Sequence, residues 1–184
     1  MKNKFKTICI YCGSSLGVDP DHQRYALNLA QLFLKYNLSL IYGGSKIGLM
    51  GIIADEILKF NGNVFGVLPK SMDKKNITHK KLTKLFIVEN MHKRKEMMFK
   101  KADGFIILPG GIGTLEEFFE TLSWAQLKIH KKPIGVLNIN GFYNLLLKSL
   151  QFQMKKGFIN KNYNELLIVS KNPKDLVEKI LSSC

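Results

Sequence analysis

The stretch Gly104-Phe-Ile-Ile-Leu-Pro-Gly-Gly-Ile-Gly-Thr114 is the clearest guide to the fold. It runs from an apolar segment, Gly104–Leu108, through a glycine-rich turn into a segment with helical spacing, Thr114–Lys128. An apolar run with little alternation is typical of a strand that is covered on both faces, as in a parallel sheet. This stretch therefore predicts one strand–helix unit of an α/β fold.

The same order recurs along the chain. Apolar runs predict strands at Thr7–Cys12, Leu38–Tyr42, Asn63–Leu68, Lys84–Val88, Gly104–Leu108, Ile134–Leu137 and Leu166–Val169. Periodicity and capping signals predict helices from Asp19-Pro20 to about Tyr36, at Leu49–Phe60, Met91–Lys101, Thr114–Lys128 and Tyr143–Lys156, and from Asn172-Pro173 to about Leu181. The segment Lys70–Lys81 is the least regular and is expected to be a loop or a short helix. With no repeat or linker, this alternation predicts a single domain over residues 1–184, a parallel sheet with helices on both faces.

The composition excludes several classes of protein. The chain has 184 residues, of which 46% are hydrophobic, and this is too apolar for a disordered protein. No apolar run approaches the roughly 20 residues that a membrane-spanning helix needs. The run Ile8–Cys12 is too short for the core of a signal peptide. We therefore expect a cytoplasmic protein without a membrane partner.

The net charge of +14 raises the question of an anionic partner. All basic residues except Arg24 and Arg94 are Lys, and the stretch Lys70–Lys101 holds 11 basic and 3 acidic residues. Proteins that read nucleic acids favour Arg, which binds guanine and phosphate through two hydrogen bonds. The pattern therefore favours a solvated face with an anion site over a nucleic-acid partner, which stays open as a weaker alternative.

The cysteine pattern does not favour a metal or redox site. Cys9 and Cys12 form a C-x-x-C pair inside a predicted strand, where residues three apart point to opposite faces. Redox pairs need a helix N-terminus, and a zinc site needs a second pair of ligands. We expect two buried thiols and no bound metal; the third cysteine is Cys184.

The turn Pro109–Thr114 is the strongest candidate for a ligand site. Its glycines, Gly110, Gly111 and Gly113, allow a ligand to approach the backbone closely, and the following helix offers free N–H groups and a positive dipole end. Together these features suit a phosphate, although a tight structural turn would look similar. No Lys precedes Thr114, so the loop is not a Walker A motif. Glu116 and Glu117 follow in the first helical turn, where acidic residues complement the helix dipole. A carboxylate there can alternatively stabilise the cationic transition state of sugar–base cleavage.

Three other segments are expected at the same edge of the sheet, where the predicted strands end and helices begin. Gly43 and Gly44 stand in a turn after the second strand, and Ser14 in a Ser-rich turn after the first. The segment Met91–Lys95 opens a helix and contains Arg94, which is conspicuous in a chain that otherwise uses Lys. Arg gives planar, bidentate binding to phosphate or carboxylate, whereas a solvated basic turn is the alternative.

Two of these segments match known motifs. Residues 109–117 match P-G-G-x-G-T-x-x-E, and residues 91–95 match M-H-x-R-K. Together they resemble the Lonely Guy (LOG) family, the cytokinin riboside 5′-monophosphate phosphoribohydrolases, many of which were once labelled lysine decarboxylases. Further similar segments extend the resemblance over nearly the whole chain: Tyr11–Ser15, Tyr42–Gly44, Gly48–Gly51, Gly66–Pro69 and Ser123–Leu127.

The resemblance implies a Rossmann-like homodimer with active sites near the interface between the subunits. It implies hydrolysis of the N-glycosidic bond of an AMP-like nucleoside 5′-monophosphate, to free base and ribose 5-phosphate, without a metal or other cofactor. The matching positions imply that Arg94 and Glu117 are catalytic. The substrate-binding positions would be Ser14, Gly44, Met91, Lys95, Gly110, Gly111, Gly113, Thr114, Glu116, which would meet the sugar, and Ser123, where relatives often have Thr.

One position departs from the family pattern. Relatives often have Glu-x-x-His before the M-H-x-R-K helix, whereas this chain has Asn76-Ile-Thr-His79. Asn keeps hydrogen bonding but loses the charge, so the preferred base, adenine or an N6-modified adenine, is left open. A non-catalytic nucleotide-binding or carrier protein with the same pocket is the main alternative. A decarboxylase is disfavoured because nothing singles out a buried Lys for pyridoxal phosphate.

Overall fold

A seven-stranded parallel sheet organises the chain, as seen in a computed structural model that describes residues 7–160 and 163–183. The strand order is β4-β3-β2-β1-β5-β6-β7, and each neighbouring pair is parallel. The predicted α/β class with a parallel sheet is thereby confirmed. The strands are β1 (Thr7–Tyr11), β2 (Ser39–Tyr42), β3 (Val64–Pro69), β4 (Lys84–Val88), β5 (Gly104–Ile107), β6 (Ile134–Leu137) and β7 (Leu167–Ser170).

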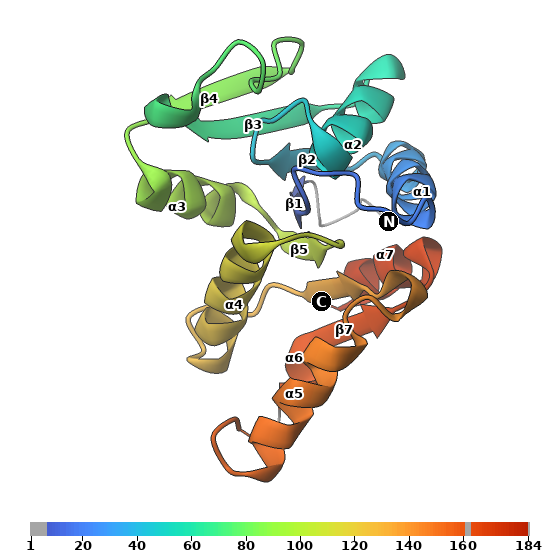
Figure 1. The fold of residues 1–184 in the computed structure, drawn as a ribbon, viewed down its shortest axis with the longest axis vertical. Coiled ribbons are helices and arrows are strands. Elements are labelled where there is room, and N and C mark those ends of the chain that lie inside the picture. The colour runs from blue at the N-terminus through green and yellow to red at the C-terminus, as the bar shows by residue number, and fades with distance from the viewer. Residues whose placement is uncertain (1–6, 161–162, 184) are drawn as a thin grey trace.

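Helices cover both faces of this sheet (Figure 1). On one face α1 (Asp21–Lys35), α2 (Gly48–Lys59) and α7 (Pro173–Ser182) bury side chains such as Phe33, Ile53 and Leu176. On the other face lie α3 (Met91–Lys101), α4 (Ile112–Gln126), α5 (Asn144–Lys155) and the short α6 (Tyr163–Leu166). Two 3-10 turns, η1 (Lys70–Met72) and η2 (Ile139–Gly141), complete the regular structure of the described residues.

Polar side chains named as capping signals lie where α7 and α1 begin. The Asn172 side chain accepts hydrogen bonds from the N–H groups of Lys174 and Asp175, and Pro173 occupies the first turn of α7. Asp19 Oδ1 accepts from the N–H of Asp21 at 2.9 Å, where α1 begins. These polar contacts satisfy N–H groups that have no partner within the helix itself.

The start of α4 differs from the prediction by two residues. The helix begins at Ile112 and not at Thr114, because Gly111 is extended and its carbonyl already accepts the N–H of Leu115. Gly113 and Thr114 therefore belong to the first helical turn. The glycine-rich turn between β5 and α4 is correspondingly shorter than expected.

The order in which strands are added reverses between β1 and β5. The strands β2, β3 and β4 are added on one side of β1, and β5, β6 and β7 on the other. Ligands of open α/β sheets bind at such a switch point, beyond the carboxyl ends of the strands. Here the loops are tied together: the N–H of Gly13 bonds to the carbonyl of Pro109 at 3.0 Å, and that of Leu49 to the carbonyl of Gly13 at 3.1 Å. The loops after β1 and β5 and the first turn of α2 are thus hydrogen-bonded to one another.

The structure also shows where the cysteines and the irregular segment lie. Cys9 and Cys12 are buried in the cores on opposite faces of the sheet, and Cys184 lies outside the described residues. The segment Lys70–Lys81 contains η1 and is held by an antiparallel bridge between Thr78 and Ser45. Within the described part of the chain, no helix is long and apolar enough to cross a membrane.

Candidate active site

Arg94 and Glu117 form a buried ion pair between two helices. Arg94 Nη1 lies 2.7 Å from Glu117 Oε1, and the two side chains are only 13% and 9% exposed. Figure 1 shows their helices, α3 and α4, next to each other on one side of the sheet. Arg94 stands in the first turn of α3 and Glu117 two residues beyond the first turn of α4. Arg94 and Glu117 are 23 residues apart in the sequence, and the fold brings these two motif residues together.

The Arg94 side chain is held in place by a backbone carbonyl of β3 and by a methionine sulfur of its own helix. Its Nε donates to the carbonyl of Val67 at 3.2 Å, and Nη1 also contacts Met91 Sδ at 3.3 Å. A Cβ atom at Gly43 would overlap Nη2, so this glycine leaves room for the guanidinium. Among the described residues Nη2 has no hydrogen-bond partner, which leaves its donors for a ligand.

Burial dominates the electrostatics of Glu117. Removal from water raises the pKa of its carboxyl above the usual value, and the neighbouring Arg94 guanidinium opposes this effect without cancelling it. A buried carboxylate with a raised pKa, paired with one cation, is a common feature of catalytic acids and bases. Glu117 therefore has the environment of a functional group as well as the position.

A second ion-pair cluster lies beside the first. The ammonium of Lys95 contacts Glu116 Oε1 and lies 2.9 Å from Glu120 Oε1. The Lys95 side chain is 10% exposed, whereas Glu116 is 51% exposed and lies over it at the surface. Sequence reasoning named Lys95 and Glu116 but missed Glu120, which stands one helical turn after Glu116 and could have been found from that spacing.

The glycine turn has two kinds of glycine. A Cβ at Gly110 would overlap the Thr114 side chain and approach the N atom of Gly13 to 2.9 Å, so this glycine is required by the packing. At Gly111 and Gly113 a Cβ would meet nothing within 4 Å in the described structure, and neither residue has a positive φ. The fold itself does not require glycine there. Close approach of a ligand is the remaining physical reason.

A cavity of about 330 Å³ adjoins this turn at the switch point. Ser14 and Gly110 line it together with Gly111, Leu49 and Phe142. The volume lies at the small end of the range for ligand pockets. Ser14 thus lies beside the glycine turn, as the sequence predicts.

Gly44, Ser123 and Asn76 lie outside the lining of that cavity. Gly44 is buried with φ +75°, and its carbonyl accepts the N–H of His79 at 3.0 Å, so the fold explains it without a ligand. Ser123 is exposed and stands nine residues beyond Thr114 on α4, about 13 Å along the helix axis. Asn76 is exposed in the segment after η1.

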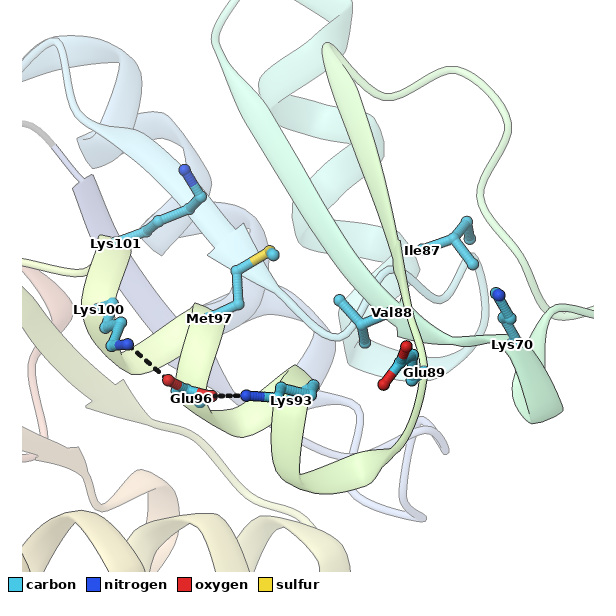
Figure 2. A pocket seen from close by; sticks show the side chains of 9 residues that line it. All are labelled: Lys70, Ile87, Val88, Glu89, Lys93, Glu96, Met97, Lys100 and Lys101. Carbon is cyan, nitrogen blue, oxygen red and sulfur yellow. Dashed lines mark hydrogen bonds and ion pairs between the residues drawn. The ribbon is translucent and has the colours of Figure 1, made fainter.

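A larger cavity, of about 640 Å³, lies between the end of β4 and the outer face of α3. Figure 2 shows its lysines around the apolar side chains of Val88 and Met97. Two of these lysines, Lys93 and Lys100, are paired with Glu96 at 3.0 and 2.5 Å. The two lysines share a single carboxylate, so most of the positive charge in this basic stretch is not offset. Among the described residues, no group of three or more acidic, His or Cys side chains could hold a metal ion.

Comparisons with known proteins give a family and a fold. A sequence model of the family described as "Possible lysine decarboxylase" matches residues 50–180. The chain is 40% identical over 179 residues to cytokinin riboside 5′-monophosphate phosphoribohydrolase LOG7 of Arabidopsis thaliana, covering 97% of this chain and 82% of the relative. LOG1 of the same plant is 41% identical over 180 residues, with 98% and 84% covered.

Solved structures support the fold. The molybdenum cofactor binding protein of Rippkaea orientalis superimposes with a TM-score of 0.73 at 21% identity, covering 97% of each chain. The Moco carrier protein of Chlamydomonas reinhardtii gives 0.73 at 14% identity, with 98% of each chain covered. At these identities the likeness is one of fold alone, and it confirms the expected Rossmann-like architecture.

Proposed function

This chain belongs to the family described as "Possible lysine decarboxylase", which includes the LOG phosphoribohydrolases, and from that premise we propose that it is a nucleoside 5′-monophosphate phosphoribohydrolase. It hydrolyses the N-glycosidic bond of AMP or of an N6-modified AMP such as a cytokinin riboside monophosphate. The observation that carries the proposal is the buried ion pair of Arg94 and Glu117 beside the glycine turn. The decarboxylase description is not followed, since relatives over nearly the full length are named phosphoribohydrolases.

The chemistry required is the breaking of the bond between C1′ of the sugar and the base. That bond breaks with positive charge developing on the sugar ring, as in glycoside hydrolysis. The Glu117 carboxylate stabilises this charge and orients the attacking water, which gives its hydroxyl to C1′ and a proton to the departing base. Arg94 contributes charge-assisted hydrogen bonds to sugar or phosphate oxygens through its free Nη2 donors. This division of roles rests on position, burial and charge.

The remaining site residues hold the nucleotide. The backbone of Gly110, Gly111 and Gly113 and the Thr114 hydroxyl bind the 5′-phosphate at the positive end of α4. Glu116 meets the sugar hydroxyls, while Ser14, Met91 and Lys95 complete the pocket. Gly44 holds the segment around His79 through its backbone carbonyl.

We also infer the assembly and the setting. The protein is a homodimer in the cytoplasm, with no nucleic-acid or membrane partner and no cofactor. Exposed apolar side chains on α4 and α5, among them Phe119, Leu145 and Phe152, support a subunit interface on that side. Ser123 is exposed on α4 and would therefore lie near that interface.

The base preference is tested with a panel of AMP, N6-isopentenyl-AMP, GMP and CMP, scored for free base. The expected result is release from the two adenine nucleotides and little from GMP or CMP. Asn76 is the position to vary: Asn76→Glu restores the residue that relatives often have, and we expect it to change the ratio between AMP and N6-isopentenyl-AMP. Equal release from all four nucleotides would contradict the proposed substrate class.

The raised pKa of Glu117 predicts the acid side of the pH profile. Catalysis needs the ionised carboxylate, and burial raises its pKa, so kcat should fall as the pH drops through a value above the roughly 4.3 of an exposed Glu. The substrate phosphate also titrates. Its titration is distinguished from that of Glu117 by repeating the pH profile with the 5′-phosphorothioate analogue of AMP. A limb that moves with the analogue belongs to the phosphate. A Glu117 limb at or below pH 4.3 would refute this assignment.

Gly113→Ala separates ligand binding from folding. A methyl group there meets no described atom within 4 Å, so the melting temperature should stay the same or rise slightly, because Ala favours helix over Gly. The added methyl group should keep the phosphate away from the backbone at this position. If the lost contact is worth about 1.4 kcal/mol, the KM for AMP should rise about tenfold. Lys174→Ala in the first turn of α7 is the matched control and should change neither quantity. An unchanged KM in Gly113→Ala would place the phosphate elsewhere.

A further inference from the structure

The cluster around Lys95 has more negative than positive charge. Arg94 and Lys95 face three carboxylates, those of Glu116, Glu117 and Glu120. A site that takes a phosphate dianion is disfavoured by surplus negative charge nearby. Two cations cannot pair one-to-one with three carboxylates, so one carboxylate shares its cation and is free to take other hydrogen-bond donors.

Glu116 is the carboxylate that can leave. It is the most exposed of the three, at 51%, whereas Glu117 is buried against Arg94. The hydroxyl groups of a ribose are donors that can replace the ammonium of Lys95. Lys95 contacts one carboxylate oxygen of Glu116, Oε1, so accepting the ribose hydroxyl groups with both oxygens requires Glu116 to give up that contact.

Lys95 cannot be left without a partner during that exchange. Its side chain is 10% exposed, and an ammonium buried to that degree is costly unless it is paired. Glu120, 26% exposed and 2.9 Å from Nζ, is the carboxylate that remains. It stands on α4 one turn beyond Glu116, so both carboxylates reach the same ammonium from one helix face.

We propose that Glu120 is a positioning residue of the sugar site: it retains the Lys95 ammonium while Glu116 exchanges that ammonium for the hydroxyl groups of the bound ribose. The inference rests on the proposed function. Without the Glu120 charge, Lys95 has Glu116 as its remaining carboxylate and keeps it. Glu116 then recognises the sugar poorly, although Glu117 and Arg94 are untouched.

The test compares AMP with 2′-deoxy-AMP in the wild type and in Glu120→Gln. The wild type should prefer AMP, because Glu116 accepts a hydrogen bond from the 2′-hydroxyl. In Glu120→Gln the KM for AMP should rise about tenfold, kcat should change less than threefold, and the preference for AMP over 2′-deoxy-AMP in kcat/KM should fall about tenfold. Glu120→Asp, which keeps the charge, should restore most of that preference.

Glu96→Gln is the matched control. Glu96 also binds two lysines, Lys93 and Lys100, but on the outer face of α3, as Figure 2 shows. It should leave KM and the sugar preference unchanged. A merely structural role of Glu120 would lower the melting temperature and leave the sugar preference within twofold of the wild type, and that result overturns the inference.

A mutant cycle guards against a folding defect in the single variant. In a Lys95→Gln background, Glu116 has no ammonium to exchange, so adding Glu120→Gln should change the sugar preference no further. A further tenfold loss in that background overturns the inference. Failure of the wild-type protein to release adenine from any nucleotide overturns the proposed function and the inference together, whereas adenine release with an unchanged preference in Glu120→Gln overturns the inference alone.

Discussion

Arg94→Ala should reduce kcat/KM for AMP by about 10³-fold or more. Removal of one donor to a developing charge costs about 10²–10³ in rate, and here the same change also leaves the buried Glu117 carboxylate unpaired. That carboxylate loses the cation that lowers its pKa, so the acid limb of the pH profile should move to higher pH. Steady-state kinetics over a range of pH measure both effects.

Arg94→Lys is the informative companion variant. It keeps the charge but loses the planar fork that contacts Glu117 and the carbonyl of Val67, and with it the Nη2 donors proposed to bind the ligand. We expect a fall of about 10–100-fold, smaller than for Ala. The melting temperature is measured alongside, because an unpaired buried charge also destabilises the fold. A folded Arg94→Ala variant with undiminished kcat/KM would remove Arg94 from the catalytic site.

Glu117→Gln should reduce kcat by about 10³-fold with little change in KM. The amide matches the carboxylate in shape and can still accept from Arg94 Nη1, but it carries no charge to stabilise the sugar cation. An interaction made only in the transition state affects kcat and kcat/KM equally. AMP should therefore still bind, which calorimetry measures directly.

Glu116→Gln gives the contrast for Glu117. Glu116 is exposed and is proposed to meet the sugar, so its variant should raise KM more than it lowers kcat. The opposite outcome, in which Glu116→Gln loses kcat and Glu117→Gln retains it, would exchange the two roles. The burial of Glu117 and its contact with Arg94 are the reasons for the present assignment.

Local patterns in the sequence predict most of the fold. The apolar runs Lys84–Val88 and Ile134–Leu137 coincide with β4 and β6, and the segment Met91–Lys101 coincides with α3. Each of these signals is local, because apolar runs and helical spacing can be recognised within a short window of sequence. The start of α4 was misjudged because Gly111 and Gly113 resemble a loop, although Gly111 caps the helix and Gly113 lies within it.

The sequence allows the residues of the candidate site to be predicted, but not the contacts between them. Arg94 stands out as one Arg among many Lys, and Glu117 follows a glycine turn. Their ion pair depends on how α3 and α4 pack, which no local pattern encodes. The same holds for Gly43 under the guanidinium and for Glu120 on Lys95, both of which are long-range contacts. Gly44, expected at the substrate, has its positive φ and its bond to His79 as a structural explanation.

The central claim is that the protein splits a nucleotide into base and sugar phosphate by hydrolysis. The most direct measurement is quantification of adenine and ribose 5-phosphate after incubation of AMP with the purified protein and with Glu117→Gln. The account predicts equal amounts of the two products from the wild type and almost none from the variant. Binding of AMP without any turnover, or release of adenosine and inorganic phosphate in place of adenine, would contradict it.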